Sequence, residues 1–216
     1  MLAVGAAGGA ATCWLIFIVS MWFGTGEIDY ASSMVLSVCF VMLTVANQSF
    51  APPHRKVCAK LATSFANIYC TLVCIVYYTN LTFVRLAESP SPEALSVVQF
   101  DPPRSAYFAI DQLGYFFMSL SVICIAWTLP QCKFRWWLGF LGVWGVTCIA
   151  IPLMPSQYDT TKDDENSQFG IVLLSVYGLL FVPTYCGLAY HYSRQGRSGE
   201  PATTVVNESS PLLTTK

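Results

Sequence analysis

Charged side chains are scarce in this sequence, and their scarcity excludes a water-soluble globular protein. Lys, Arg, Asp and Glu make up 11% of the 216 residues, whereas soluble domains carry roughly 25%. So few charges cannot cover a surface that faces water, but they suffice when lipid surrounds most of the protein. The formal net charge is −1, so the chain lacks the broad basic field that holds nucleic acid.

Histidine is also rare, and common catalytic motifs are missing. The two histidines, His54 and His191, both lie at the edges of apolar stretches. This placement excludes a haem held by paired histidines inside the membrane. The sequence contains no HExxH zinc motif, no phosphate-binding P-loop and no GxSxG nucleophile motif. We therefore expect a protein that is not an enzyme and that holds no cofactor and no metal.

What the sequence has in abundance is apolar residues, gathered in six long stretches. Hydrophobic residues make up 55% of the chain, and a helix of roughly 20 apolar residues crosses a bilayer core about 30 Å thick. We predict an all-α bundle of six transmembrane helices, with the lipid bilayer as its partner. The expected spans are 2–23, 32–50, 61–84, 106–129, 136–154 and 169–190.

The first stretch resembles a signal peptide only in part. Residues 1–10 contain no Lys or Arg, so the basic region that begins a signal peptide is missing. We expect this span to be retained. Its cleavage would leave five spans and would move the N-terminus to the other side of the membrane.

The connections between the spans alternate in charge. Lys and Arg predominate in 51–60, in 130–135 and just after residue 190, whereas Asp and Glu predominate in the other three connections. Loops rich in Lys and Arg stay on the cytosolic side. The sequence therefore predicts that both termini lie in the cytosol.

Asp111 is the only Asp, Glu, Lys or Arg inside any expected span. A carboxylate within a membrane is costly, so it is a candidate functional group by default. Tyr107 and Tyr115 lie four residues on either side of it, which places all three on one helix face. Gln112 adjoins it. The group lies about two helical turns inside the extracytosolic end of its span.

Three roles are open for Asp111. We place first a structural anchor that is hydrogen-bonded to neighbouring helices or paired with Arg104 or Arg85, which lie on the same side of the membrane. The second role is a step in a proton- or cation-coupled path. The third is a contact to a polar ligand or a lipid headgroup.

Small residues and one proline predict how the helices pack. Gly5-x-x-x-Gly9 and the run of Gly139, Gly142 and Gly145 are typical of close contacts between membrane helices. Pro183 predicts a kink in the sixth span, because proline lacks the amide hydrogen that a helix needs.

None of the nine cysteines lies in an expected extracytosolic loop, where disulfides persist. Seven lie inside expected spans, where we expect them to pack as small apolar residues. Cys58 and Cys132 instead lie in cytosolic connections next to the membrane. Both are candidates for reversible palmitoylation.

The C-terminal segment 193–216 changes character, with Ser, Thr, Gly, Pro and isolated charges in no periodic order. Such a composition predicts a disordered cytosolic tail. Glu208 lies four residues before the pair Leu212-Leu213, which resembles the acidic dileucine sorting signal. Clathrin adaptor proteins that bind this signal send membrane proteins to endosomes and lysosomes. We expect an endolysosomal location, with the plasma membrane or another endomembrane as the alternative.

Residues 97–120, VVQFDPPRSAYFAIDQLGYFFMSL, resemble a segment of a family of small multi-span membrane proteins of bacteria and archaea. In that family a helix of the pattern A-[IL]-[DE]-x-L-G-Y-x-x-M-S-L follows an Asn-Pro loop. Asp111 stands where the first acid of the pattern lies, and Gln112 replaces the second. The resemblance implies a bundle of about six helices and carries no activity. The matching residues are Ala109, Leu113, Gly114, Tyr115, Met118, Ser119 and Leu120.

We interpret the chain as a membrane protein that moves or senses a small solute, an ion or a proton. The helix 106–129 would act near its extracytosolic end. The alternative is a scaffold or accessory subunit whose spans serve only assembly and trafficking. A third class, a lipid-modifying enzyme, would need a second catalytic group close to Asp111.

Overall fold

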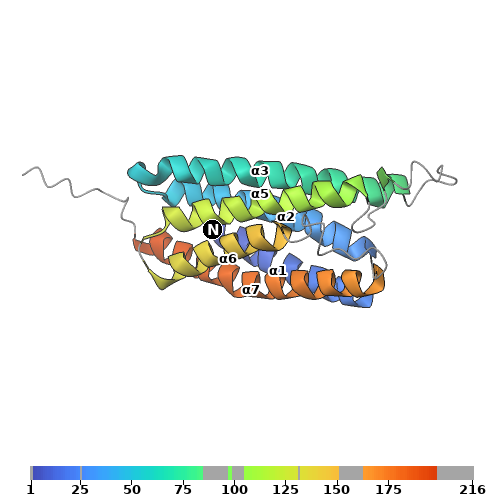
Figure 1. Ribbon diagram of the computed structural model, residues 1–216. Coiled ribbons are helices and arrows are strands. Elements are labelled where there is room, and N and C mark those ends of the chain that lie inside the picture. The colour runs from blue at the N-terminus through green and yellow to red at the C-terminus, as the bar shows by residue number, and fades with distance from the viewer. Residues whose placement is uncertain are drawn as a thin grey trace, which may run out of the picture.

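The computed structural model describes residues 2–24, 26–84, 97–98, 105–130, 132–150 and 163–198. This part of the chain is all-α, which confirms the predicted fold class. Figure 1 shows the helices side by side in one elongated bundle. Each expected span overlaps one long helix. The long helices are α1 (Leu2–Phe23), α2 (Gly26–Phe50), α3 (Lys56–Thr79), α5 (Ala106–Thr128), α6 (Lys133–Ala150) and α7 (Asp163–Ser198).

Within the described residues, four helical segments are long and apolar enough to cross a membrane. They are Leu2–Phe23, Gly26–Phe50, Pro53–Phe83 and Ala106–Thr128. Large hydrophobic side chains also lie on the outer surface of the bundle, as with Val35, which is 53% exposed. Exposed apolar surface of this kind suits lipid and would be costly in water. The bundle is therefore compatible with an integral membrane protein.

Several helices extend beyond the stretches that the sequence predicts, since α2 begins at Gly26 rather than at 32 and α3 at Lys56 rather than at 61. The turn before α2 contains Gly24, whose φ of +65° favours glycine. The 3-10 helix η1 (Pro53–Arg55) leads directly into α3, and the π-helical turn η2 (Asn80–Val84) follows it. Hydropathy marks the part of a helix that suits hydrocarbon, whereas backbone hydrogen bonding can continue into water.

The last helix corrects the predicted boundary of the tail. The sequence places a disordered tail at 193–216, but α7 continues to Ser198. The first residues of the predicted tail are therefore helical, while 199–216 lie outside the described residues. Pro183 lies inside α7 and does not end it.

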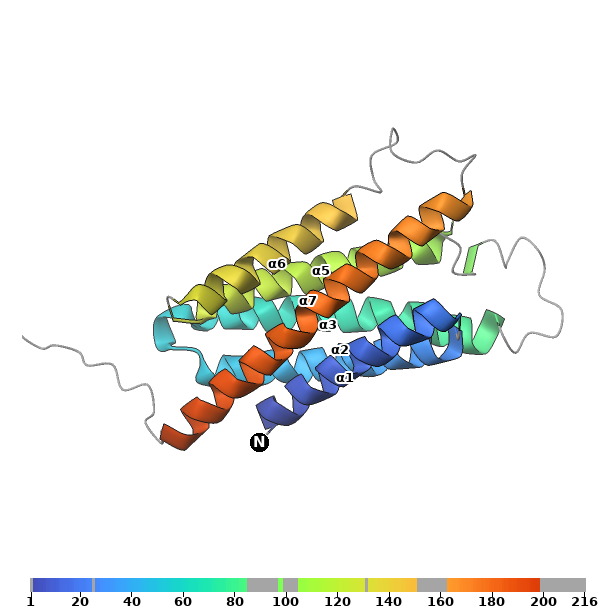
Figure 2. The ribbon, with the colours of Figure 1, turned by 90° about the horizontal axis from the view of Figure 1, so that it is seen from below.

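Each long helix packs against one or two main neighbours. α1 packs between α2 and α7, α3 packs between α2 and α5, and α6 packs mainly against α5. A smaller contact between α6 and α7 includes the Trp137 indole, which donates to the Thr184 hydroxyl over 3.0 Å. Figure 2 shows α7 running obliquely across the view in front of α3. The first and last helices of the chain are thus neighbours.

An aromatic centre joins these helices. The ring of Trp14 in α1 is fully buried, and its centroid lies 6.5 Å from Tyr115 in α5 and 6.1 Å from Phe181 in α7. Gly178 lets α7 approach this ring, because a Cβ atom there would lie 2.6 Å from a Trp14 carbon. The core therefore depends on a large ring that faces a glycine.

The predicted glycine contacts occur at three of the five positions. A Cβ atom at Gly9 would lie 2.9 Å from the Cys39 sulfur, and one at Gly142 would lie 2.9 Å from a backbone oxygen of α5. Gly145 adjoins the hydroxyls of Ser119 and Tyr177. Gly5 and Gly139 have open space within 4 Å. Close packing therefore involves one glycine of the first pattern and two of the second.

Candidate functional site

The start of α5 fixes the position of Asp111. Ser105 caps this helix, because its hydroxyl accepts a hydrogen bond of 3.1 Å from the backbone nitrogen of Phe108. Gly114 lets α3 approach closely, since a Cβ atom there would lie 3.3 Å from Val73. The Asp111 side chain is 2% exposed. The carboxyl group is therefore held inside the bundle rather than against lipid.

Hydroxyl groups from three helices surround this carboxyl group. The hydroxyl of Tyr77 in α3 is within hydrogen-bonding reach of it, and the Tyr77 ring stacks on Tyr30 of α2 at 5.2 Å. The Tyr115 hydroxyl approaches those of Tyr77 and Ser33, without the geometry of a complete hydrogen bond. The Tyr69 ring lies 5.7 Å from that of Tyr115. We call Ser33, Tyr69, Tyr77, Asp111 and Tyr115 the Asp111 cluster.

Most of the cluster is buried without partners. Asp111 Oδ1, the Tyr69 and Tyr115 hydroxyls and Ser33 Oγ have no hydrogen-bond partner in the described part of the chain. A buried polar group left in this state costs about 1–3 kcal/mol. Groups of this kind are normally satisfied by water or by a bound polar species. The arrangement therefore suits a small polar occupant.

The other residues predicted for this site lie apart from it or outside the described residues. The Tyr107 hydroxyl donates to Thr79 Oγ1 over 3.5 Å, and Gln112 is half-buried. Arg85 and Arg104, the predicted ion-pair partners, are not among the residues that the structure describes. Sequence reasoning missed Tyr77, Tyr69 and Ser33 as neighbours of Asp111. The available signal was the depth of Tyr77, near the extracytosolic end of its span.

The predicted modification and sorting residues have mixed outcomes. The thiol of Cys58 is half-buried in α3, while Cys132 is exposed just before α6. Palmitoylation therefore stays a prediction, and Cys132 is the more accessible of the two. Glu208, Leu212 and Leu213 lie outside the described residues.

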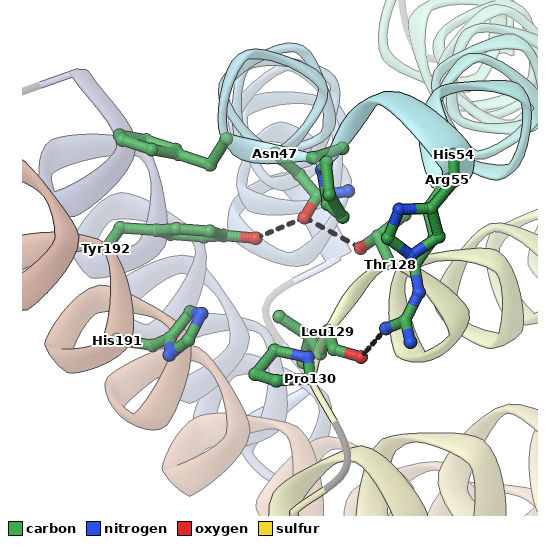
Figure 3. A pocket seen from close by; sticks show the side chains of 11 residues that line it. Asn47, His54, Arg55, Thr128, Leu129, Pro130, His191 and Tyr192 are labelled. Carbon is green, nitrogen blue, oxygen red and sulfur yellow. Dashed lines mark hydrogen bonds between the residues drawn. The ribbon is translucent and has the colours of Figure 1, made fainter. Parts of the chain in front are cut away.

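A pocket of about 270 Å³ lies at the other end of the bundle, where α2 and α5 end, α3 begins and the C-terminal part of α7 passes. Figure 3 shows side chains from these elements around it. We call this cavity the Asn47 pocket. Its lining consists of Asn47, Phe50, Ala51, Pro52, His54, Arg55, Thr128, Leu129, Pro130, His191 and Tyr192.

Hydrogen bonds hold the wall of the Asn47 pocket. Asn47 Oδ1 accepts from the Tyr192 hydroxyl over 2.7 Å and from the Thr128 hydroxyl over 3.1 Å. One side chain of α2 is thereby tied to both α7 and α5. The Arg55 guanidinium donates to the backbone oxygen of Leu129 at the end of α5, where a cation also suits the helix dipole. Figure 3 shows these contacts.

His191 lies on the α7 side of the pocket, beyond the predicted end of the sixth span. Partial burial lowers the pKa of its imidazole below the ordinary value, because desolvation disfavours the charged form. The described residues contain no cluster of three or more His, Cys, Asp or Glu side chains suited to a metal ion. The lining of the pocket contains the nitrogen groups of Asn47, His54, Arg55 and His191 and no Asp or Glu.

Comparisons with models of protein families, with curated proteins and with solved structures find no match for this chain. The resemblance of residues 97–120 to a family of small multi-span proteins therefore stays a prediction. The site is interpreted from its own geometry.

Proposed function

We propose that the chain is a six-span integral membrane protein with both termini in the cytosol. It moves or senses a small polar solute, an ion or a proton, and it is not an enzyme. The four candidate spans and the alternating charge of the connections support this topology. In this topology α6 and α7 complete the set of spans.

The observation that carries the proposal is the buried Asp111 carboxyl group with an unpartnered oxygen beside unpartnered hydroxyls. A carboxyl group inside a membrane bundle is typical of proton and cation paths. The neighbouring tyrosine hydroxyls both donate and accept hydrogen bonds. They therefore suit a relay that passes a proton, or a shell that holds a cation or water beside the carboxylate.

The test measures proton movement in liposomes that contain the purified protein and a trapped pH-sensitive dye, with the voltage clamped by potassium and valinomycin. The wild-type protein is expected to dissipate a pH gradient faster than empty liposomes. Asp111→Asn should abolish this difference because it removes the titratable group while keeping the shape. Glu27→Gln, an exposed exchange of the same chemistry, is the control. Full flux in Asp111→Asn would remove Asp111 from the mechanism.

A favourable result would also separate this function from the scaffold alternative. A scaffold predicts no flux in any variant and equal assembly in all of them. Folded protein that dissipates the pH gradient no faster than empty liposomes would contradict proton movement. The same liposomes serve for other small solutes that are offered on the outside.

We also propose an endolysosomal location, directed by the acidic dileucine signal. Glu208, Leu212 and Leu213 support it by their spacing near the end of a cytosolic tail. Replacing both leucines by alanine should move a tagged protein to the cell surface, as surface biotinylation would measure. Replacing Thr214 and Thr215 by alanine is the matched control. An unchanged location of the double-leucine variant would contradict the sorting role.

A further inference from the structure

The Asn47 pocket has an excess of donors that its own hydrogen bonds do not use. Asn47 is 2% exposed, and while its oxygen is doubly bonded, its Nδ2 has no partner among the described residues. Arg55 carries five N–H donors, and within the described part of the chain one of its hydrogen bonds goes to the backbone oxygen of Leu129. His54 and His191 also line the cavity, and the lining contains no Asp or Glu. The occupant that fits is rich in acceptors and carries negative charge.

The volume and the position of the pocket narrow the range of ligands that fit it. A volume of about 270 Å³ lies just below the range of roughly 300–1,000 Å³ for drug-sized ligands, so it suits a headgroup-sized anion. Arginine favours phosphate because its planar fork matches two oxygens at once. The lining includes Arg55 from the basic connection 51–60 and Pro130 from the basic connection 130–135. The sequence places both connections next to the cytosolic leaflet. Anionic phospholipids concentrate in that leaflet.

We propose that the Asn47 pocket is a binding site for a phosphate group, supplied by an anionic phospholipid headgroup or by a free phosphate. Arg55 contacts the phosphate oxygens by charge-assisted hydrogen bonds, and Asn47 Nδ2 donates to a further oxygen. His54 and His191 close the site from η1 and α7. Occupation therefore links the ends of α2 and α5 and the C-terminal part of α7 through one anion. This site is separate from the Asp111 cluster and does not depend on the proposed transport.

Calorimetry on the full-length protein in neutral detergent tests this proposal with three probes: short-chain phosphatidic acid, short-chain phosphatidylcholine and inorganic phosphate. The wild-type protein should bind phosphatidic acid. Additional binding of inorganic phosphate would identify the free phosphate as sufficient, and its absence would identify the lipid as the source. The proposal would be overturned if zwitterionic phosphatidylcholine bound as tightly as phosphatidic acid. It would also be overturned if neither phosphatidic acid nor inorganic phosphate bound.

Two variants separate the site from general charge attraction. Arg55→Gln keeps a donor for Leu129 and removes the charge, and Asn47→Asp keeps the oxygen that Tyr192 and Thr128 use. Each should weaken binding by about tenfold or more, as expected for the loss of a charge-assisted hydrogen bond. Arg135→Gln is the matched control, because Arg135 lies at the same end but stacks over Trp127 at 4.7 Å. An equal loss in Arg135→Gln would show nonspecific attraction and would overturn the site.

The pKa of the His191 imidazole gives a second measure of binding that is independent of calorimetry. Burial holds its pKa below the ordinary value, and a phosphate anion in the pocket should raise it by favouring the imidazolium. His54, Arg55 and Tyr192 are the other titratable side chains of the lining. Nuclear magnetic resonance of labelled histidine should show this upward shift in the wild-type protein and not in Arg55→Gln. A His191 pKa that is unchanged by saturating phosphatidic acid would contradict the site.

Discussion

The two ends of the bundle bury polar groups in opposite ways. Near the predicted extracytosolic end, Asp111 Oδ1 and the Tyr69 and Tyr115 hydroxyls lack partners in the described part of the chain. At the other end, Asn47 Oδ1 accepts two hydrogen bonds from two different helices. The Asp111 cluster therefore offers an acceptor that can bind a proton or a cation. The Asn47 pocket offers donors that can bind an anion. The same physical rule, that buried polar groups are satisfied, assigns the two ends different occupants.

The largest expected effect on stability comes from removing the Asn47 side chain. Asn47→Ala leaves the Tyr192 and Thr128 hydroxyls without their shared acceptor, so unfolding should become easier by about 1–2 kcal/mol, the upper range for interhelical hydrogen bonds in membranes. Unfolding in mixed detergent micelles, followed by tryptophan fluorescence, measures the change. The exposed Asn67→Ala serves as the control. Equal stability of Asn47→Ala and wild type would show that the hydrogen bonds to Asn47 do not stabilise this end of the bundle.

The Asp111 cluster should respond in activity rather than in stability. Tyr77→Phe removes the hydroxyl that faces the carboxyl group, so it should lower any proton flux while changing the free energy of unfolding by about 0.6 kcal/mol or less. Tyr78→Phe is a closely matched control, because Tyr78 is the next residue of α3 and is 59% exposed. Equal flux in the two variants would remove Tyr77 from the path.

Tyr192→Phe should reduce stability less than Asn47→Ala does. This change deletes one of the two hydrogen bonds to Asn47 and leaves the ring, which stacks on Phe50 at 5.2 Å. The expected loss is about 0.6 kcal/mol, the mean for one such bond, measured by the same unfolding assay. Tyr190→Phe, at a residue that is 61% exposed, controls for loss of a tyrosine hydroxyl. A loss as large as that of Asn47→Ala would show that Thr128 contributes nothing to this centre.

Hydropathy alone predicts the helices, because the requirement for apolar residues in lipid acts on each segment separately. It also finds Asp111, since one acid in an apolar stretch is visible without any neighbour. The partners of Asp111 are different. Tyr77 and Ser33 meet it only because α2, α3 and α5 pack together, and this packing depends on contacts such as that of Gly114 with Val73. The depth of Tyr77 in its span is compatible with this contact, but the sequence of one segment does not specify which helices will pack against it.

The Asn47 pocket was missed for the same reason. Its walls come from the end of α2, the turn at η1, the end of α5 and the C-terminal part of α7. In the sequence, Asn47 is one polar residue within an expected span, and His54 and His191 are isolated residues at the edges of spans. The tail boundary at residue 193 was wrong because composition changes before the helix ends. The first turn of a polar segment can continue a helix whose hydrogen bonds are already formed.

The contact between the first and last helices has a consequence for how the protein is made. The Trp22 indole donates to Ser175 Oγ over 3.1 Å across 153 residues. A ribosome that adds roughly 5–20 residues per second needs ~8–30 s to reach that partner. Throughout that interval the face of α1 that will meet α7 must be covered by lipid, by the insertion machinery or by a chaperone. Assembly of the bundle therefore includes a late docking of α7 against α1, and a chain that stops before α7 would leave this face of α1 without its partner.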